Sequence, residues 1–145
     1  MNSLSRLRAL SAEERWLVVE ATFALAVAAM AIACFRFRRI AAVVGRAREA
    51  AIDEALCAKL VQQVRWAVAG CALRLPWRTK CFEQGLAAQW MLCRRRIPAT
   101  LHYGVARRDG NELMAHVWVR TAFSEVIGCE NSGDFAELAR FPANP

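Results

Sequence analysis

Two stretches decide the fold of this chain: residues 77–85, with the sequence WRTKCFEQG, and residues 115–119, with the sequence AHVWV. The first predicts the start of a helix with Cys81 in its first turn. Unpaired backbone N–H groups and the helix dipole favour negative charge there, so a thiolate forms more easily than in bulk water. The second predicts a half-buried strand that holds His116 rigidly beside that helix start. Cys81 and His116 are therefore a candidate nucleophile and a candidate general base.

Helical patterns dominate the chain before these two stretches. Ser11 and Glu14 have the spacing of a capping box, which predicts a helix start. A further helix is expected over residues 53–68, where apolar residues recur at four-residue steps along one face. Helical character is also expected over residues 40–48. The first half of the chain is therefore predicted to be helical.

Strand patterns follow the Cys81 helix, which a run of arginines and Pro98 bring to an end. Strands are predicted at residues 100–107, 113–121 and 125–129, with a turn at 108–111 and a final helical turn at 135–141. Helices followed by strands predict an α+β fold, in which the Cys81 helix packs on a small antiparallel sheet. We expect a single domain over residues 1–145, with a helical N-terminal part (1–70) and a core that carries the Cys81 helix and the sheet (71–141).

Composition limits the partners and cofactors to be expected. Twenty Lys and Arg against 13 Asp and Glu give a formal charge of +7, which suits an anionic partner without selecting one. The six cysteines form neither a C-x-x-C pair nor a Cys/His cluster at zinc spacing, and there is no glycine-rich phosphate loop. We therefore expect no metal, no cofactor and no nucleic-acid partner. Because no secretory signal pattern is present, we expect reduced thiols and a cytoplasmic location.

Residues 21–35 form an almost wholly apolar run that Glu20 separates from the apolar residues before it. A bilayer span needs about 20 apolar residues, so this run is short, and its many alanines weaken the drive for insertion. We expect a helix that is buried in the domain or faces a partner, and no stable membrane span. A membrane segment and a helix lying on a membrane surface, helped by the basic cluster Arg36, Arg38 and Arg39, are the alternatives.

Several of these elements occur together in a known family. Cys81 before an apolar helix, the exit RRRIP (94–98), the strand LHYGV (101–105) and the stretch AHVWV (115–119) follow the order found in the lasso-peptide leader peptidases. The chain resembles this family over residues 77–141. The resemblance implies a transglutaminase-like, papain-related cysteine protease that removes the leader from a ribosomally made precursor before macrocyclisation. It also implies three partners: the precursor peptide, a small leader-binding protein and the macrocyclase.

The chain departs from this family at the third catalytic residue. The family has an aspartate after the histidine, but no aspartate lies between His116 and Asp134. If the strands that flank residues 122–124 form a hairpin, the position opposite His116 is close to 130. Glu130 is the nearest carboxylate and our first candidate for the group that orients the imidazole. Asn131 and Asp134 are alternatives, and an incomplete triad is a further one.

Two tryptophans are candidates for binding the substrate. Trp77 precedes Cys81 by one helical turn, and Trp118 shares a strand face with His116, so both could line a groove for an extended peptide. Each could equally be a core residue. His102 competes with His116 for the role of base. The alternative function is a non-enzymatic basic module that docks a partner protein or a membrane surface, in which Cys81 is only part of the core.

Overall fold

The computed structural model describes residues 9–36, 39–40, 53–108 and 112–142. These residues form three long helices and a four-stranded antiparallel sheet, so the predicted α+β fold is confirmed. The elements are α2 (Ala12–Cys34), α4 (Glu54–Ala72), α5 (Cys81–Arg94), β1 (Ala99–Arg108), β2 (Glu112–Thr121), β3 (Glu125–Ile127), the short 3₁₀ helix η1 (Ser132–Asp134) and β4 (Ala136–Phe141). The predicted helical residues 41–48 and most of the predicted turn at 108–111 lie outside the described ranges.

The first helix, α2, begins at the predicted capping box. The Ser11 hydroxyl accepts a hydrogen bond from the Glu14 N–H at 3.2 Å, and the Glu14 carboxylate accepts one from the Ser11 N–H at 2.7 Å. Glu20, which interrupts the apolar sequence, forms an ion pair with Arg95 at 2.6 Å and so joins α2 to the end of α5. The buried residues of α2 are Leu17, Ala21, Ala24, Leu25 and Ala28. One face of the helix is therefore part of the core.

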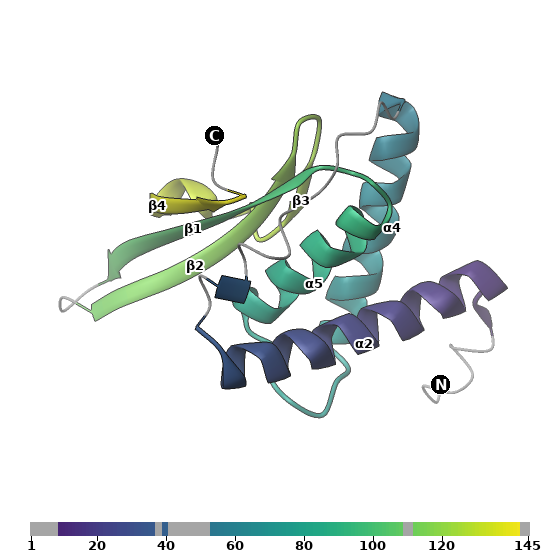
Figure 1. Ribbon diagram of the computed structural model, residues 1–145, viewed down its shortest axis with the longest axis horizontal. Coiled ribbons are helices and arrows are strands. Elements are labelled where there is room, and N and C mark those ends of the chain that lie inside the picture. Colours follow the sequence, from purple (N-terminus) through teal and green to yellow (C-terminus); the bar gives the residue numbers. More distant parts are fainter. Residues whose placement is uncertain (1–8, 37–38, 41–52, 109–111, 143–145) are drawn as a thin grey trace.

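The central element is α5, which lies between the sheet and α2 (Figure 1). Gly85 lets this helix approach the sheet closely, because a Cβ at this position would lie only 2.7 Å from Cγ1 of Val117. Gln89 is fully buried at the same interface, and its side-chain amide donates to the carbonyls of Ala99 at 2.9 Å and Phe141 at 2.7 Å. The helix is thus fixed to the start of β1 and the end of β4.

The sheet has the strand order β3-β2-β1-β4. The predicted helical turn at residues 135–141 is wrong, because most of this segment is β4 and pairs antiparallel with β1, with Phe141 opposite Leu101. Its composition favours a helix, but pairing with the edge of β1 overrides that weak local preference. The strand predicted at 125–129 is also shorter than expected, since β3 ends at Ile127 and Gly128 adopts a φ of 72°.

Candidate active site

Cys81 is the first residue of α5, as the sequence predicted. Lys80 is the N-cap, and its backbone N–H donates to the carboxylate of Glu83 in the first turn. The Cys81 side chain is half-buried and faces the sheet at the level of Val117. The start of α5 therefore brings the thiol against β2, one residue from His116.

The surroundings of the thiol act on its pKa in opposite directions. Burial raises the pKa of Cys81, because the apolar surroundings disfavour the thiolate. Hydrogen bonds from the backbone N–H groups of Val117 and Phe82 lower the pKa, while the nearby charge of Glu83 raises it. Burial is the largest of these effects, so Cys81 holds its proton more strongly than an ordinary cysteine, contrary to the easier ionisation expected from its place at the helix start. The backbone donors nevertheless lie where a thiolate needs them.

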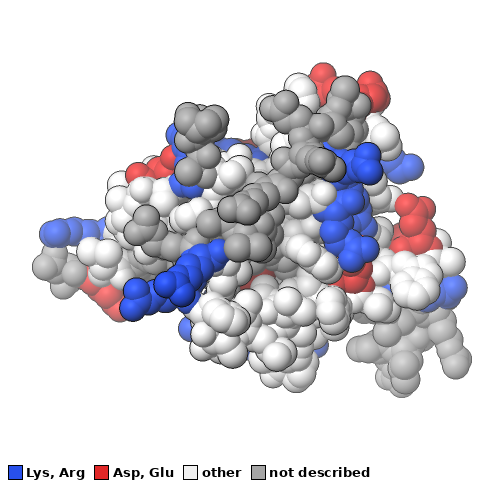
Figure 2. Space-filling view, in the orientation of Figure 1, with Lys and Arg blue, Asp and Glu red and all other residues white. Residues whose placement is uncertain are grey.

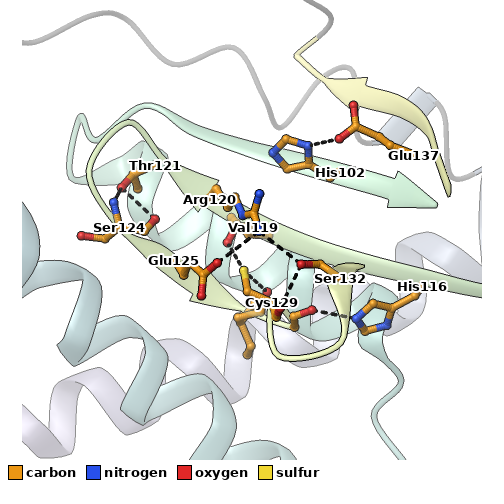
Figure 3. Close-up of polar contacts among 12 residues, drawn as sticks. His102, His116, Val119, Arg120, Thr121, Ser124, Glu125, Cys129, Ser132 and Glu137 are labelled. Atoms are coloured by element: carbon orange, nitrogen blue, oxygen red, sulfur yellow. Dashed lines mark hydrogen bonds and ion pairs between the residues drawn. The ribbon is translucent and has the colours of Figure 1, made fainter. Parts of the chain in front are cut away.

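His116 is held by a backbone carbonyl. Its ring nitrogen Nε2 lies 2.7 Å from the carbonyl oxygen of Gly128, the first residue after β3 (Figure 3). The ring also contacts two aromatic side chains: Trp118, stacked with a centroid distance of 6.1 Å, and Phe135, tilted at 4.8 Å. These three contacts fix the orientation of the imidazole.

Cys81 and His116 open onto the same cavity, which has a volume of about 320 Å³ and lies between α4, the start of α5, β2 and the end of β3. The residues that line it are Arg65, Ala69, Cys81, Gln84, His116, Val117, Ile127, Gly128 and Glu130. The structure thus brings together the two residues predicted as nucleophile and base. Arg65 and Gly128 are residues of this cavity that the sequence analysis did not single out.

Glu130 lines this cavity too, but its partner is a different residue. Its Oε1 lies 3.0 Å from Nη2 of Arg65 on α4, and this ion pair is partly exposed to solvent. The observed pair Val119–Ile127 would place position 130 opposite His116 if β3 continued, but the strand ends at Ile127. The role of Glu130 in orienting His116 therefore stays a prediction. In the structure, Nε2 of His116 is hydrogen-bonded to the carbonyl of Gly128.

The two alternatives for the third group flank the short 3₁₀ helix. Asn131 is the N-cap of η1 and Asp134 is its last residue. Within the described ranges, the side-chain hydrogen bond of His116 is to Gly128 and involves neither of them. Their catalytic roles also stay predictions.

The two tryptophans have different environments. Trp118 is only 3% exposed and stacks on both His102, at 5.5 Å, and His116. It therefore packs against the His116 ring from the protein interior. Trp77 is 38% exposed, four residues before Cys81, and does not line the cavity. A role in substrate binding stays a prediction for both.

His102 lies outside the cavity and has its own acidic partner. Its Nδ1 is 2.8 Å from Oε2 of Glu137 on β4, as Figure 3 shows. Burial lowers the pKa of His102, and the hydrogen bond with Glu137 raises it. Since Trp118 stacks on His102, this histidine packs behind the site and does not face Cys81.

The architecture and this cavity define an α+β protein whose central helix begins at a cysteine and packs on an antiparallel sheet that carries a histidine. A family model described as the transglutaminase-like superfamily matches residues 18–140, and the chain belongs to this superfamily. Its domain is commonly that of a cysteine peptidase. Comparisons with curated proteins and with solved structures gave no match. Because the match begins within α2, the N-terminal helices are part of the superfamily domain.

Among the described residues, no group of three or more His, Cys, Asp or Glu side chains could hold a metal ion. None of the cysteines in the described ranges forms a disulfide with another.

Proposed function

We propose that the protein is a cysteine peptidase that removes the leader from a ribosomally made lasso-peptide precursor before macrocyclisation. The observation that carries the peptidase activity is the shared cavity of Cys81 and His116 at the start of α5. Membership of the transglutaminase-like superfamily supports it. The substrate class rests on the order of the sequence motifs from Cys81 to the AHVWV stretch.

The proposed reaction is acyl transfer to Cys81 followed by hydrolysis. His116 accepts the thiol proton, and the thiolate attacks the carbonyl carbon of the scissile peptide bond. Backbone N–H groups at the start of α5 stabilise the oxyanion, and the protonated His116 gives its proton to the leaving amine. Water, deprotonated by His116, then attacks the thioester and releases the leader carboxylate. Cys81 recovers its proton, so the cycle balances.

The exposed face of α2 supports a partner protein. Its large apolar residues are Trp16, Val19, Phe23, Val27 and Met30, which are 74, 57, 59, 46 and 68% exposed. We call this set the α2 stripe. Its members are three or four residues apart, so they form one narrow row along the helix, the pattern of a helix–helix seam. We propose that the leader-binding protein packs a helix against the α2 stripe. The lower edge of the molecule in Figure 2, where Figure 1 places α2, is mostly uncharged.

A membrane span is a poorer explanation of the α2 stripe. The helix is long and apolar enough to cross a membrane by length and composition. However, its other face packs in the core, and Glu20 is paired with Arg95. Insertion into a bilayer would expose that core to water and break the ion pair, which a helix lying against a partner avoids.

The alternative function is a binding module without catalysis, and the exposed α2 stripe is the observation that favours it. The two functions differ in whether Cys81 is needed. Incubation of the protein with a candidate lasso-peptide precursor, with and without the leader-binding protein, tests this directly. We expect release of the leader, read by mass spectrometry, and its loss in Cys81→Ala. A precursor that stays intact under both conditions would favour the binding module.

A matched control for this experiment lies on the same helix. Cys93 is also half-buried on α5, and burial also raises its pKa. It does not line the cavity. Cys93→Ala should therefore retain leader cleavage, which separates loss of the nucleophile from a general effect of removing a thiol from α5.

A further inference from the structure

We propose that the backbone carbonyl of Gly128 is the positioning group for His116 and serves where related enzymes use a carboxylate. The proposal deepens the peptidase function and rests on it for its catalytic meaning. The geometry itself is a hydrogen bond of 2.7 Å between Nε2 of His116 and the Gly128 oxygen. A carbonyl oxygen only accepts hydrogen bonds, so Nε2 must carry the proton. In the neutral ring Nδ1 is then the basic nitrogen, ready to accept the thiol proton of Cys81.

The backbone conformation of Gly128 places its carbonyl beside His116 and leaves no room for a side chain at position 128. Its φ of 72° is one that glycine adopts without strain. A Cβ here would lie 2.6 Å from the carbonyl oxygen of Val117 and 3.4 Å from Nε2 of His116. The place beside Nε2 that a carboxylate would occupy is therefore filled by backbone.

The segment after Gly128 is pinned to β2, which fixes the direction of the carbonyl (Figure 3). The Cys129 thiol donates to the carbonyl of Val119 at 3.3 Å. The Ser132 hydroxyl donates to the carbonyl of Cys129 at 2.9 Å and accepts from Nη2 of Arg120 at 3.2 Å. These bonds hold the acceptor of His116 rigidly, as a positioning group requires.

Carboxylates near the site are bound to other partners. Glu130 pairs with Arg65 at 3.0 Å, and Glu137 pairs with His102 and with Arg140. In the part of the chain that the structure describes, the ion pairs of Glu130 and Glu137 do not involve His116. The acceptor for its Nε2–H is accordingly the neutral carbonyl.

A neutral acceptor changes the resting state of the site. A carboxylate stabilises an imidazolium by its full charge, whereas a carbonyl offers only its dipole. Burial also raises the pKa of Cys81, so we expect its thiol to hold its proton before the substrate arrives, with the thiolate formed only as the reaction begins. The charged groups around this pair are Arg65 of α4, Glu83 of α5 and Glu130 after β3; Arg65 and Glu130 neutralise each other.

The protonation of the His116 ring is directly measurable. The chain has two histidines, so ¹⁵N spectra of histidine-labelled protein contain two rings, and the signals missing from His116→Ala assign His116. At neutral pH we expect Nε2 of His116 to carry a proton, both in the wild type and in Glu130→Gln. A resting ring that is protonated on Nδ1 and unprotonated on Nε2 would overturn the proposal.

A matched pair of carboxylate variants supplies the kinetic test. Glu130 is 63% exposed and 3.0 Å from Arg65, while Glu125 on β3 is 61% exposed and 3.1 Å from Arg120, away from the cavity. We expect kcat for leader cleavage to fall by less than about tenfold in both Glu130→Gln and Glu125→Gln. A larger fall in kcat confined to Glu130→Gln would assign the orienting role to Glu130 and refute the role of Gly128.

The two measurements separate this proposal from the proposed function. An Nε2-protonated ring in a protein that cleaves no precursor would leave the hydrogen bond standing and refute the peptidase. Cleavage by a protein in which Nε2 of His116 carries no proton would refute the role of Gly128 and leave the peptidase standing.

Discussion

The backbone N–H of Val117 donates a hydrogen bond to the Cys81 thiol, one residue beyond His116 on the same strand. β3 ends at Ile127, which pairs with Val119. The part of β2 before Val119 is therefore not paired with β3, and the start of α5 lies there. The distance between the candidate nucleophile and base is therefore set by the backbone of β2 and α5. Loss of either side chain should leave this frame intact.

Cys81→Ala should abolish leader cleavage while the protein stays folded. The change is small, and the packing of α5 on the sheet depends on other residues of the helix, such as Gly85 and Gln89. His116→Ala should have a similar effect, and the double variant should be no worse than either single one, because nucleophile and base act as a unit. Cleavage assays with circular dichroism as the folding check measure this. Activity in Cys81→Ala would rule out the assignment.

Alkylation of Cys81 by iodoacetamide should be slow at neutral pH and rise steeply with pH. Burial raises the pKa of this thiol, so at a given pH less of it is thiolate than in an ordinary cysteine. Below that pKa the rate should grow about tenfold per pH unit. Peptide mapping by mass spectrometry, with the exposed Cys34 as the internal reference, gives the rate at each pH. A rate that is already maximal at pH 6 would mean a resting ion pair with His116.

The same experiment examines the role of His116 as base. If its ring assists ionisation of the thiol, His116→Ala should slow alkylation of Cys81 at neutral pH by about tenfold or more. Cys34, on α2, should be unaffected. Equal rates in the wild type and the variant would indicate that Cys81 is only a core residue, as the binding-module function requires.

Gly85→Ala should destabilise the protein, because the new Cβ would lie 2.7 Å from Cγ1 of Val117 and force α5 away from β2. Overpacking of this kind costs about 1–3 kcal/mol of unfolding free energy. Gly133→Ala is the control, since a Cβ there meets nothing within 4 Å. Urea unfolding monitored by tryptophan fluorescence compares the two. Equal midpoints would contradict the close approach of α5 and the sheet.

The sequence predicted those elements whose local signals agree with their tertiary surroundings. The capping box at Ser11 marked the start of α2, and the Cys81 helix began where expected. β4 was missed because residues 136–141 contain good helix formers, and only the neighbouring β1 makes them a strand. No side-chain pattern could reveal the acceptor of His116, since Gly128 contributes only its carbonyl. A glycine at the end of a predicted strand was the one available signal of a bend there.

A charge within the α2 stripe should weaken binding of the leader-binding protein without unfolding the peptidase. Met30 is 68% exposed and is the last residue of the α2 stripe, so Met30→Glu should leave the core unchanged. Burying the new carboxylate against a partner helix is costly, and we expect the affinity to fall at least about tenfold. Lys59→Glu on α4, at an exposed position outside the α2 stripe, serves as the control. It changes the net charge by more than Met30→Glu does. Calorimetric titration gives the two affinities, and a thermal melt checks the fold. Tight binding by Met30→Glu together with weak binding by Lys59→Glu would move the docking surface from α2 to α4.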